Sequence, residues 1–265
     1  MVTLKVLIEN TALSENFRKE HGLSLYLETD THKILFDTGK SDQFLANAQA
    51  LGTDLSEADT AVISHGHYDH TGGLNAFLNL NKKAPVYINR QAFLPHFYGS
   101  QEYIGMDPTI IPDRRFVLID DFLKIDDTLS LYSCNGMSAF PPVGNEGFSV
   151  LQQGRMMPDQ FWHEHYLLIR DAGRKILITG CSHKGILNLV NWFKPDVLVG
   201  GFHFMGLDPE HPKARKLLEH AAQTLQQYPT HYYTGHCTGS RQYDLLKEIL
   251  GDQLHAISSG MCTKL

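Results

Sequence analysis

The sequence predicts a mixed α/β domain of layered sheets and helices, and two observations support this. Short apolar runs of strand type alternate with amphipathic segments of helix length along the 265 residues. Histidine, aspartate and cysteine side chains follow the ends of several of these runs, where a rigid sheet can present side chains from its loops. We therefore expect a core of sheets and helices, with the functional residues on loops.

Strands and helices alternate in the first part of the chain. Residues 23–28 alternate apolar and polar side chains, and a second apolar run at 33–36 follows turn residues, which is typical of a hairpin. Ser41 is a suitable N-cap for a helix that ends at Leu51, because Gly52 follows directly. The elements expected here are strands at 5–9, 23–28, 33–36, 60–63 and 85–88, and helices at 41–51 and 74–80.

The same alternation returns in the second part of the chain. The apolar runs at 166–170 and 175–179 flank Ala172 and Gly173, so we expect them to pair as a hairpin. No linker-like stretch and no strong internal repeat interrupts the chain, which predicts a single domain over residues 1–265. The elements expected here are strands at 116–119, 129–132, 166–170, 175–179, 196–199, 231–234 and 254–258, and helices at 186–193, 209–228 and 241–250.

Two segments lack a clean period. Residues 91–115 scatter aromatic and aliphatic side chains among Pro and Gly, and residues 135–160 are rich in Gly, Pro and Met. For the first segment, one interpretation is loose packing around the core. The other is a lid or rim that covers a cleft or meets a second subunit in a homodimer. The second segment resembles an active-site loop. We interpret His96, in the first segment, as a surface residue rather than a substrate contact.

The densest group of chemically active side chains follows the apolar run at 60–63. His65 and His67 alternate, so an extended backbone would point both imidazoles the same way, and Asp69 and His70 follow where the chain must turn. Three imidazoles and one carboxylate suit zinc first, with iron or manganese as alternatives. A histidine-rich surface loop is the plain alternative, but this spacing after a buried-type strand favours a metal site.

The loop resembles the HxHxDH signature of the metallo-β-lactamase superfamily, and the resemblance extends over nearly the whole chain. The other stretches that carry it are FDTG at 36–39, TGCSH at 179–183 and TGHCTG at 234–239. Four stretches resemble a narrower, prokaryotic branch of this superfamily. They are IENT at 8–11, GCSHKGI at 180–186, GGFH at 200–203 and TGHCTG at 234–239. Members of this branch are often labelled 7,8-dihydropterin-6-methyl-4-(β-D-ribofuranosyl)aminobenzene-5′-phosphate synthases.

This resemblance implies a four-layer αββα sandwich and a site for two metal ions, with zinc expected. By resemblance, the first ion would be held by His65, His67 and His183, and the second by Asp69, His70 and His236. In this superfamily the residue that matches Asp37 usually supports the metal loop by orienting its ligands. A plain turn residue is the alternative interpretation of Asp37.

The chain departs from the superfamily's usual pattern at Cys181. Many members place a bridging Asp at this position, so Cys181 is either a thiolate ligand that replaces it or a small buried residue. His163 and His165 compete with His183 for the third histidine of the first ion, because that ligand precedes the strand in many members. We favour His183.

Composition restricts the partners and the compartment. The formal net charge of -6 provides no basic surface of the kind that nucleic-acid binding requires, although two divalent ions would still accept an anionic small molecule. No apolar run is long enough to span a membrane, and residues 1–5 lead into a strand rather than a signal peptide. The four scattered cysteines do not form a disulfide framework, so we expect a cytoplasmic protein.

Together these features predict a metal-dependent hydrolase that uses a metal-activated water to cleave an ester, phosphoester or related bond of a small molecule. Asp69 would be a ligand and the proton acceptor for that water. His203 would assist the leaving group or bind substrate, with a structural hydrogen bond as the alternative. The alternative functions are a pterin or phosphoribosyl-related synthase, an iron-dependent redox enzyme, and a binding module without turnover. The redox alternative is weak, because diiron oxygen reductases of this superfamily typically carry Glu at the position of His67.

Overall fold

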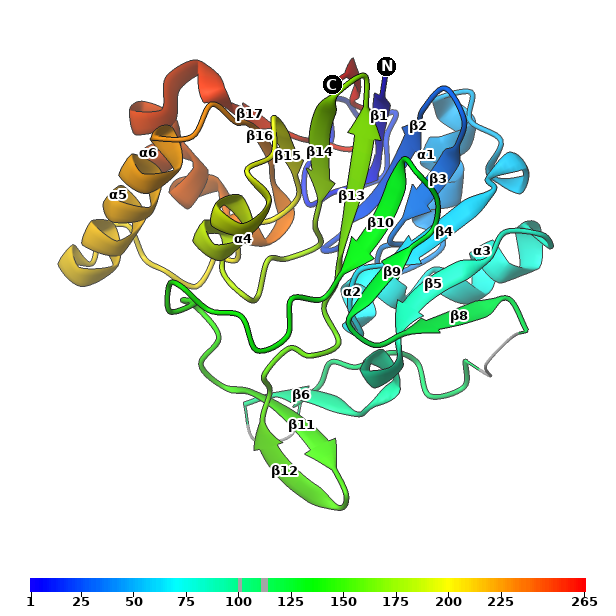
Figure 1. Cartoon of the computed structure of the whole chain (residues 1–265), viewed down its shortest axis with the longest axis horizontal. Coiled ribbons are helices and arrows are strands. Elements are labelled where there is room, and N and C mark those ends of the chain that lie inside the picture. Colours follow the sequence, from blue (N-terminus) through cyan, green and yellow to red (C-terminus); the bar gives the residue numbers. More distant parts are fainter. Residues whose placement is uncertain (100–101, 111–113) are drawn as a thin grey trace.

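The computed structural model describes residues 1–99, 102–110 and 114–265. Within these ranges two seven-stranded sheets face each other, and helices cover the outer face of each sheet (Figure 1). Buried apolar residues form one cluster between the sheets and one under each helical layer. The result is a four-layer αββα sandwich, and it confirms the predicted fold class.

The first sheet has the strand order β18-β1-β2-β3-β4-β5-β8. β2 and β3 form the predicted antiparallel hairpin, and β3, β4, β5 and β8 run parallel to one another. The strands are β1 (Thr3–Ile8), β2 (Ser24–Glu28), β3 (Lys33–Phe36), β4 (Thr60–Ile63), β5 (Val86–Asn89), β8 (Phe116–Ile119) and β18 (Cys262–Lys264).

The second sheet has the strand order β17-β16-β15-β14-β13-β10-β9. β14 to β17 run parallel, so the loops that follow them leave the sheet at one edge. The strands are β9 (Phe122–Lys124), β10 (Leu129–Tyr132), β13 (Tyr166–Asp171), β14 (Arg174–Ile178), β15 (Val197–Val199), β16 (His231–Thr234) and β17 (Leu254–Ala256).

Helices form the two outer layers. α1 (Gln43–Ala50) and α3 (Leu74–Leu80) cover the first sheet, and α4 (Ile186–Phe193), α5 (Pro212–Gln226) and α6 (Ser240–Leu250) cover the second (Figure 1). On α5 the buried side chains recur at helical spacing, which explains why a sequence with a polar opposite face forms this helix. The buried residues of α5 are Leu218, Ala221, Ala222 and Leu225. Shorter helical turns are α2 (Tyr68–Thr71), η1 (Leu55–Glu57), η2 (Arg90–Phe93), η3 (His236–Thr238) and η4 (Gly251–Gln253).

A smaller four-stranded sheet, in the order β12-β11-β6-β7, lies beside the sandwich. Its hairpin of β11 (Phe148–Gln152) and β12 (Arg155–Pro158) projects from the body (Figure 1), and β11 pairs with β6 (His96–Tyr98). β7 (Glu102–Tyr103) is the fourth strand. The two segments without a clean period therefore form one sheet, which their sequences did not indicate because the pairing partners are far apart in the chain. Residues 100–101 and 111–113 of the range 91–115 lie outside the described residues.

One predicted helix starts at a different residue in the structure, and two short strands were not predicted. The first long helix begins at Gln43 and has Asp42 at its N-cap position, because the Ser41 hydroxyl donates instead to Glu20 over 2.6 Å. Strands β9 and β18 were not predicted, because each is only three residues long. β9 pairs with the next strand, β10, and β18 pairs with β1 at the other end of the chain.

No helix in the described part of the chain is both long enough and apolar enough to cross a membrane.

Candidate metal centre

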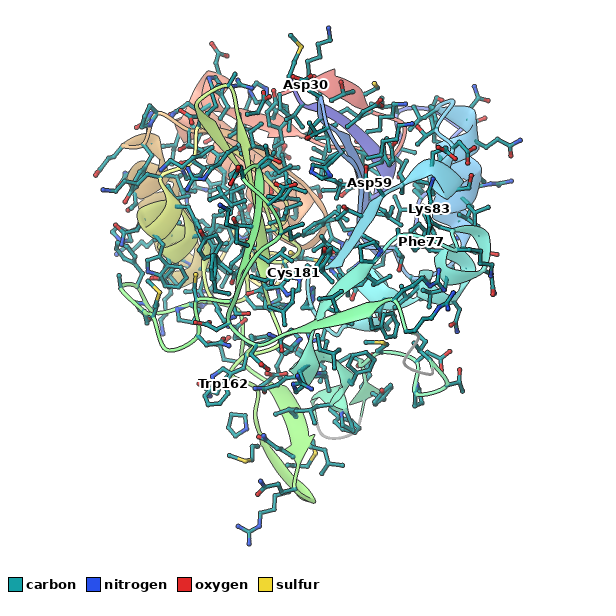
Figure 2. The ribbon with its side chains drawn as sticks, turned by 45° about the vertical axis from the view of Figure 1, so that its right-hand side comes forward. Asp30, Asp59, Phe77, Lys83, Trp162 and Cys181 are labelled. Carbon is teal, nitrogen blue, oxygen red and sulfur yellow. The ribbon has the colours of Figure 1, made fainter. Side chains whose placement is uncertain are left out.

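The predicted ligand residues lie on loops at the carboxyl ends of neighbouring strands. Because β3 and β4 are parallel in one sheet and β14, β15 and β16 in the other, these loops meet between the two halves of the sandwich. Figure 2 shows Cys181, which follows β14, near the middle of the molecule. The loop after β4 carries His65, His67, Asp69 and His70, that after β14 carries His183, that after β15 carries His203, and that after β16 carries His236.

His65, His67 and His183 form the first group of converging side chains. Their ligand atoms all lie within 4.8 Å of one another, and all three residues are buried. The Nε2 atom of each is buried and has no hydrogen-bond partner. Three buried ring nitrogens without partners are costly unless a ligand meets them, so this arrangement fits a bound metal ion.

Hydrogen bonds on the other side of the rings hold two of these histidines in the tautomer that a metal needs. The Ser64 hydroxyl donates to Asp37 Oδ2 over 2.7 Å, so it accepts from Nδ1–H of His65 over 2.8 Å. Nδ1–H of His183 donates to Oδ1 of Asn145 over 3.4 Å. In both residues the Nε2 lone pair therefore faces the partner histidines and is free to bind a cation.

Asp69, His70 and His236 form the second group. Oδ2 of Asp69 lies 3.2 Å from Nε2 of His236 and 3.7 Å from Nε2 of His70. The two histidine Nε2 atoms lie 3.2 Å apart. Nδ1–H of His70 donates to Asp37 over 2.7 Å, and Nδ1–H of His236 donates to Asn10 over 3.0 Å. The nitrogen available to a metal ion is again Nε2 in each case.

Cys181 lies between the two groups. Its Sγ atom is 3.3 Å from Nε2 of His70, and it falls within 4.8 Å of the ligand atoms of both His65 and His70. The thiol is buried, and burial raises its pKa well above the usual range. Of the two sequence interpretations, the position between the groups favours the ligand over the small buried residue.

The protonation of the first group suits metal binding. Burial lowers the pKa of His65, His67 and His183 well below the usual range, and for His65 and His183 neighbouring imidazoles lower it further. These side chains are neutral at pH 7, and neutral imidazole is the form that binds a metal.

His70 and Asp69 behave differently, because they face each other. Burial lowers the pKa of His70, but Asp69 and Asp37 raise it more, to about 9. Burial raises the pKa of Asp69, but His70 and His236 outweigh it and hold that pKa below the usual range. A cation at this position would replace the extra proton on His70.

Four residues at this edge have backbone conformations that side-chain-bearing residues rarely adopt. φ is 58° at Asp37, 60° at Ser182, 58° at His203 and 50° at His236. Such conformations cost about 1–3 kcal/mol each and concentrate at functional sites. Their gathering around the two groups marks the same region as the candidate site.

His203 also lines this region. Nε2–H donates to the carbonyl oxygen of Gly144 over 3.0 Å, and Nδ1 is buried without a hydrogen-bond partner. Its ring centroid lies 4.2 Å from that of His183. Burial lowers the pKa of His203, but the contact with Cys237 outweighs it, and the net shift is upward.

The competing histidines His163 and His165 occupy other surroundings. His163 accepts a hydrogen bond at Nδ1 from the backbone N–H of Gly66, which is the reverse of the pattern at His65 and His183. His165 is buried with both ring nitrogens unpartnered. Burial, then Lys184 and His163, lower the pKa of His165 to about 3.

The interpretation of His96 as a surface residue was wrong, because its side chain is 1% exposed and contacts Asp159.

Sequence reasoning missed His21. Its Nε2 atom lies 3.3 Å from Oδ2 of Asp69, and its ring centroid lies 4.9 Å from that of His236. A single histidine before an alternating strand carries little signal, so only the approach of the loop after β1 to Asp69 identifies it. Nearby, Glu9 accepts from the backbone N–H of His236 over 2.5 Å and Asn10 holds its ring, which explains part of the IENT motif.

A cleft of about 370 Å³ opens onto both groups. Its polar lining includes His67, Asp69, His183 and His236 together with Cys181 and Cys237, and its wall contains aromatic and apolar side chains. The described residues that line it include no Lys and no Arg. The two segments without a clean period contribute Tyr98, Glu102, Ile104, Gly144 and Phe148 to the wall.

Comparison with protein families and solved structures agrees with this geometry. The family model described as the metallo-beta-lactamase superfamily matches residues 18–137. The solved structure of Tm1679, described as a metal-dependent hydrolase of the beta-lactamase superfamily, is 28% identical to this chain. It superposes with a TM-score of 0.80 over 100% of this chain and 99% of its own.

Two proteins of Methanocaldococcus jannaschii are also similar. One, an uncharacterized protein, is 29% identical over 261 residues, which cover 93% of this chain and 94% of the relative. The other is a 7,8-dihydropterin-6-methyl-4-(beta-D-ribofuranosyl)-aminobenzene-5'-phosphate synthase. It is 26% identical over 272 residues, which cover 94% of this chain and 91% of the relative.

Proposed function

The chain belongs to the metallo-β-lactamase superfamily, and we propose that it is a hydrolase with two metal ions that cleaves an uncharged ester or lactone. The observation that carries this proposal is the convergence of six side chains in two groups beside one cleft, which is lined by His67 and His183 of the first group and by Asp69 and His236 of the second. His65, His67 and His183 would hold one ion, and Asp69, His70 and His236 the other. Cys181 would contact both groups.

The donor set favours zinc. Nitrogen, carboxylate and thiol donors together suit zinc better than magnesium or calcium, which prefer oxygen ligands alone. When bound, two such ions lower the pKa of water toward neutrality and polarise the bond under attack. The upward shift in the pKa of His70 means that binding must release a proton, so affinity falls as the pH falls.

The other catalytic steps are assigned to two side chains of the cleft. Asp69 is ionised at neutral pH, because His70 and His236 lower its pKa, so its carboxylate can accept a proton from the attacking water. His203 lines the same cleft, and the upward shift in its pKa suits a residue that protonates the leaving oxygen. Each role needs only a proton held or moved at a side chain of this chain.

The cleft wall supports an uncharged substrate over a phosphate-bearing one. A phosphate group usually binds Arg or Lys, and the described lining has neither. Glu102 adds a negative charge at the rim, while Tyr98 and Phe148, whose ring centroids lie 5.0 Å apart, offer an aromatic surface. The segments 91–115 and 135–160 would then form the rim that selects the substrate.

The second candidate is a synthase activity like that of the pterin relative. The 26% identity over 94% of this chain favours it. It requires a phosphorylated ribosyl substrate by the relative's name, and the lack of Lys and Arg in the described lining counts against that substrate.

The deciding experiment measures metal content and turnover on the same preparations. We expect about two equivalents of zinc per chain and hydrolysis of ester or lactone substrates by the wild-type protein. His67→Ala should lose metal and activity together, whereas His220→Ala, an exposed histidine on α5, should retain both. Full metal content with full turnover in His67→Ala would contradict the site. Iron in place of zinc, with visible absorbance, would support the redox alternative.

A further inference from the structure

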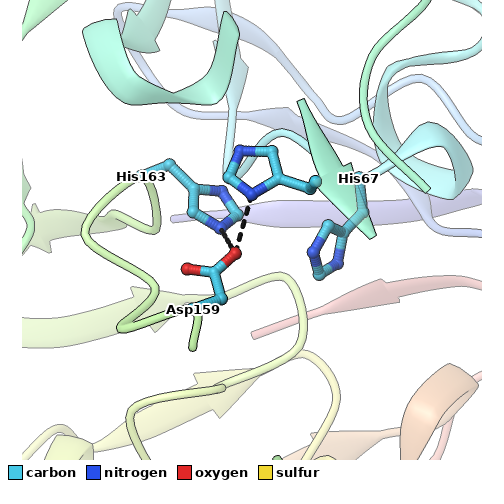
Figure 3. Close-up of side chains that lie close together, drawn as sticks. His67, Asp159 and His163 are labelled. Carbon is cyan, nitrogen blue, oxygen red and sulfur yellow. Dashed lines mark hydrogen bonds and ion pairs between the residues drawn. The ribbon is translucent and has the colours of Figure 1, made fainter. Parts of the chain in front are cut away.

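A second cluster of titratable side chains lies beside His67. Nδ1 of His96 lies 2.7 Å, and Nε2 of His163 lies 3.3 Å, from the same oxygen, Oδ2 of Asp159. The three side chains are at most 4% exposed. One ring nitrogen of His67 lies within 4.8 Å of the ligand atoms of all three. Figure 3 shows Asp159 and His163 beside His67. This network, formed by His96, Asp159 and His163, is outside the function proposed above.

The surrounding hydrogen bonds show where its protons lie. The backbone N–H of Gly66 donates to Nδ1 of His163 over 2.9 Å, so neutral His163 carries its proton on Nε2. That Nε2 lies 3.3 Å from Oδ2 of Asp159 as an ion-pair contact and makes no hydrogen bond to any described residue. Nδ1–H of His96 donates to Oδ2 of Asp159 over 2.7 Å, and Nε2 of the same ring faces the carbonyl oxygen of Gln91 at 3.2 Å, so both ring nitrogens of His96 face acceptors. Oδ1 of Asp159 accepts from the backbone N–H of Phe161 over 2.7 Å. Asp159 is therefore an ionised acceptor at the centre of the network.

These hydrogen bonds argue against a third metal site. Three imidazoles and a carboxylate have the donor chemistry of a zinc site, but His163 does not fit. A cation on its Nε2, while Nδ1 accepts from Gly66, would require the imidazolate form. At His65 and His70 the Nδ1–H donates instead, which leaves Nε2 free. Nε2 of His163 has no hydrogen-bond partner in the described part of the chain. The bond from Gly66 to its Nδ1 and the bonds of Asp159 with His96 and Phe161 nevertheless fit a hydrogen-bonded cluster better than ligation.

The network holds the metal loop at its middle. Gly66 lies between two predicted ligands, His65 and His67, and its N–H is the group that His163 accepts. A Cβ at Gly66 would overlap the backbone of Ala92, so the loop also packs directly on the segment after β5. Movement of this peptide would displace both neighbouring imidazoles.

The network does not line the substrate cleft. His96, Asp159 and His163 line a separate cavity of about 120 Å³, on whose wall Trp162 also lies. None of the three is among the residues that line the 370 Å³ cleft. The network contacts the metal loop through the hydrogen bond that His163 accepts from Gly66.

We propose that His163 and Asp159 are positioning residues for the metal loop, an inference that rests on the metal centre of the proposed function. His163 fixes the Gly66 peptide, and Asp159 fixes His163 and places a negative charge beside the ring of His67. Residues that orient metal ligands in this way typically change metal affinity by about 10–100-fold when they are replaced.

The test compares two replacements of His163. His163→Leu removes the acceptor for Gly66, whereas His163→Asn places a carbonyl oxygen close to the former Nδ1 position. Zinc affinity is measured by competition with a chromophoric chelator, without substrate. We expect an affinity loss of about 10–100-fold for His163→Leu and recovery of most of it in His163→Asn. Asp159→Asn, which keeps the shape but not the charge, should lie between them.

Gln152→Ala is the matched control, because Gln152 lines the same cavity without belonging to the network. It should bind zinc as the wild type does. Wild-type affinity in both His163→Leu and Asp159→Asn would overturn the positioning role. A third equivalent of zinc that is lost in both variants would overturn it in favour of a metal site. Because zinc affinity is measured without substrate, the result can be interpreted even if the protein is not a hydrolase. If His163→Leu does not fold, His163→Asn and Asp159→Asn carry the comparison.

Discussion

Oδ2 of Asp37 lies 2.7 Å from Nδ1 of His70, and both side chains are fully buried. The same carboxylate accepts from the backbone N–H and the hydroxyl of Ser64, each over 2.7 Å. Ser64 in turn orients His65. Asp37, at the end of β3, therefore sets the tautomers of His70 and, through Ser64, of His65. This favours the interpretation that Asp37 orients the candidate ligands over the interpretation that it is only a turn residue.

Replacing Asp37 tests this relationship. Asp37→Asn is the suitable change, because asparagine tolerates the φ of 58° at this position. We expect it to keep the fold and to weaken zinc binding about 10–100-fold, because the charge that orients His70 is lost. Chelator competition measures the effect. Asp54→Asn, at the start of η1, is the control and should bind zinc normally. Unchanged zinc affinity in Asp37→Asn would leave the carboxylate as a turn residue only.

Cobalt substitution tests Cys181. A thiolate ligand produces a sulfur-to-cobalt charge-transfer band in the near ultraviolet, and we expect this band in the wild type. Cys181→Ala should abolish it, whereas Cys237→Ala should retain it, because Cys181 is the thiol that lies 3.3 Å from Nε2 of His70. The reverse result would make Cys237 the ligand. Absence of the band from the wild type would return Cys181 to a small buried residue.

The metal-free protein should lose stability in mild acid. Burial lowers the pKa of His163 to about 4 and that of His165 to about 3, whereas an unfolded histidine has a pKa of about 6.5. Below pH 6.5 the unfolded state binds more protons, so the free energy of unfolding falls. Linkage gives about 2 kcal/mol for each residue between pH 6.5 and pH 5. Urea unfolding of chelator-treated protein at both pH values measures it, and equal stability would contradict the burial of neutral imidazole.

The contribution of His70 to stability depends on pH in the opposite direction. The pKa of this histidine is raised to about 9, so its contribution to the stability of the metal-free protein is present below pH 6.5 and is lost as the pH rises through about 9. Zinc addition at pH 7 to Cys181→Ala, in which no thiol at this position contributes a proton, should therefore release a proton from His70, which a weakly buffered pH indicator would detect. No proton release would show that His70 is already neutral in the metal-free protein.

His165→Leu separates the two competing interpretations of that residue. Both ring nitrogens of His165 are buried without partners, so leucine should stabilise the protein by about 1 kcal/mol at pH 7 and reduce its acid sensitivity. Zinc content should stay at the wild-type level. Loss of a zinc equivalent would identify His165 as the ligand that precedes the strand.

Glu102→Lys tests the choice of substrate. If the cleft selects against negative charge, lysine at the rim should raise kcat/KM for a phosphate-bearing ester more than for an uncharged one. The comparison within one variant controls for general effects on the fold. A parallel change for both substrates would show that the cleft rim does not choose between them.

Much of the site could be predicted from neighbouring residues. The loop after β4 showed its candidate ligands because four of them follow one buried strand, and the candidates His183 and His236 were found through the motifs that resemble the superfamily. His21 and the network at Asp159 could not be found in this way. Each is a single residue in an ordinary local context, and the contact between Gly66 and His163 spans 97 positions.

The sequence by itself determined the alternation of strands and helices and the ligand spacing of residues 65–70, since both depend on residues close together in the chain. Only the tertiary structure decided which ring nitrogen of each histidine is free. That choice depends on acceptors such as Asp37, Asn10 and Asn145, which lie on other loops. The position of His96 also depends on distant residues: we expected it at the surface, but it is buried against Asp159. The hydrogen-bonding group that faces each ring nitrogen determines which nitrogen of an imidazole carries the proton, and these groups come together only when the chain folds.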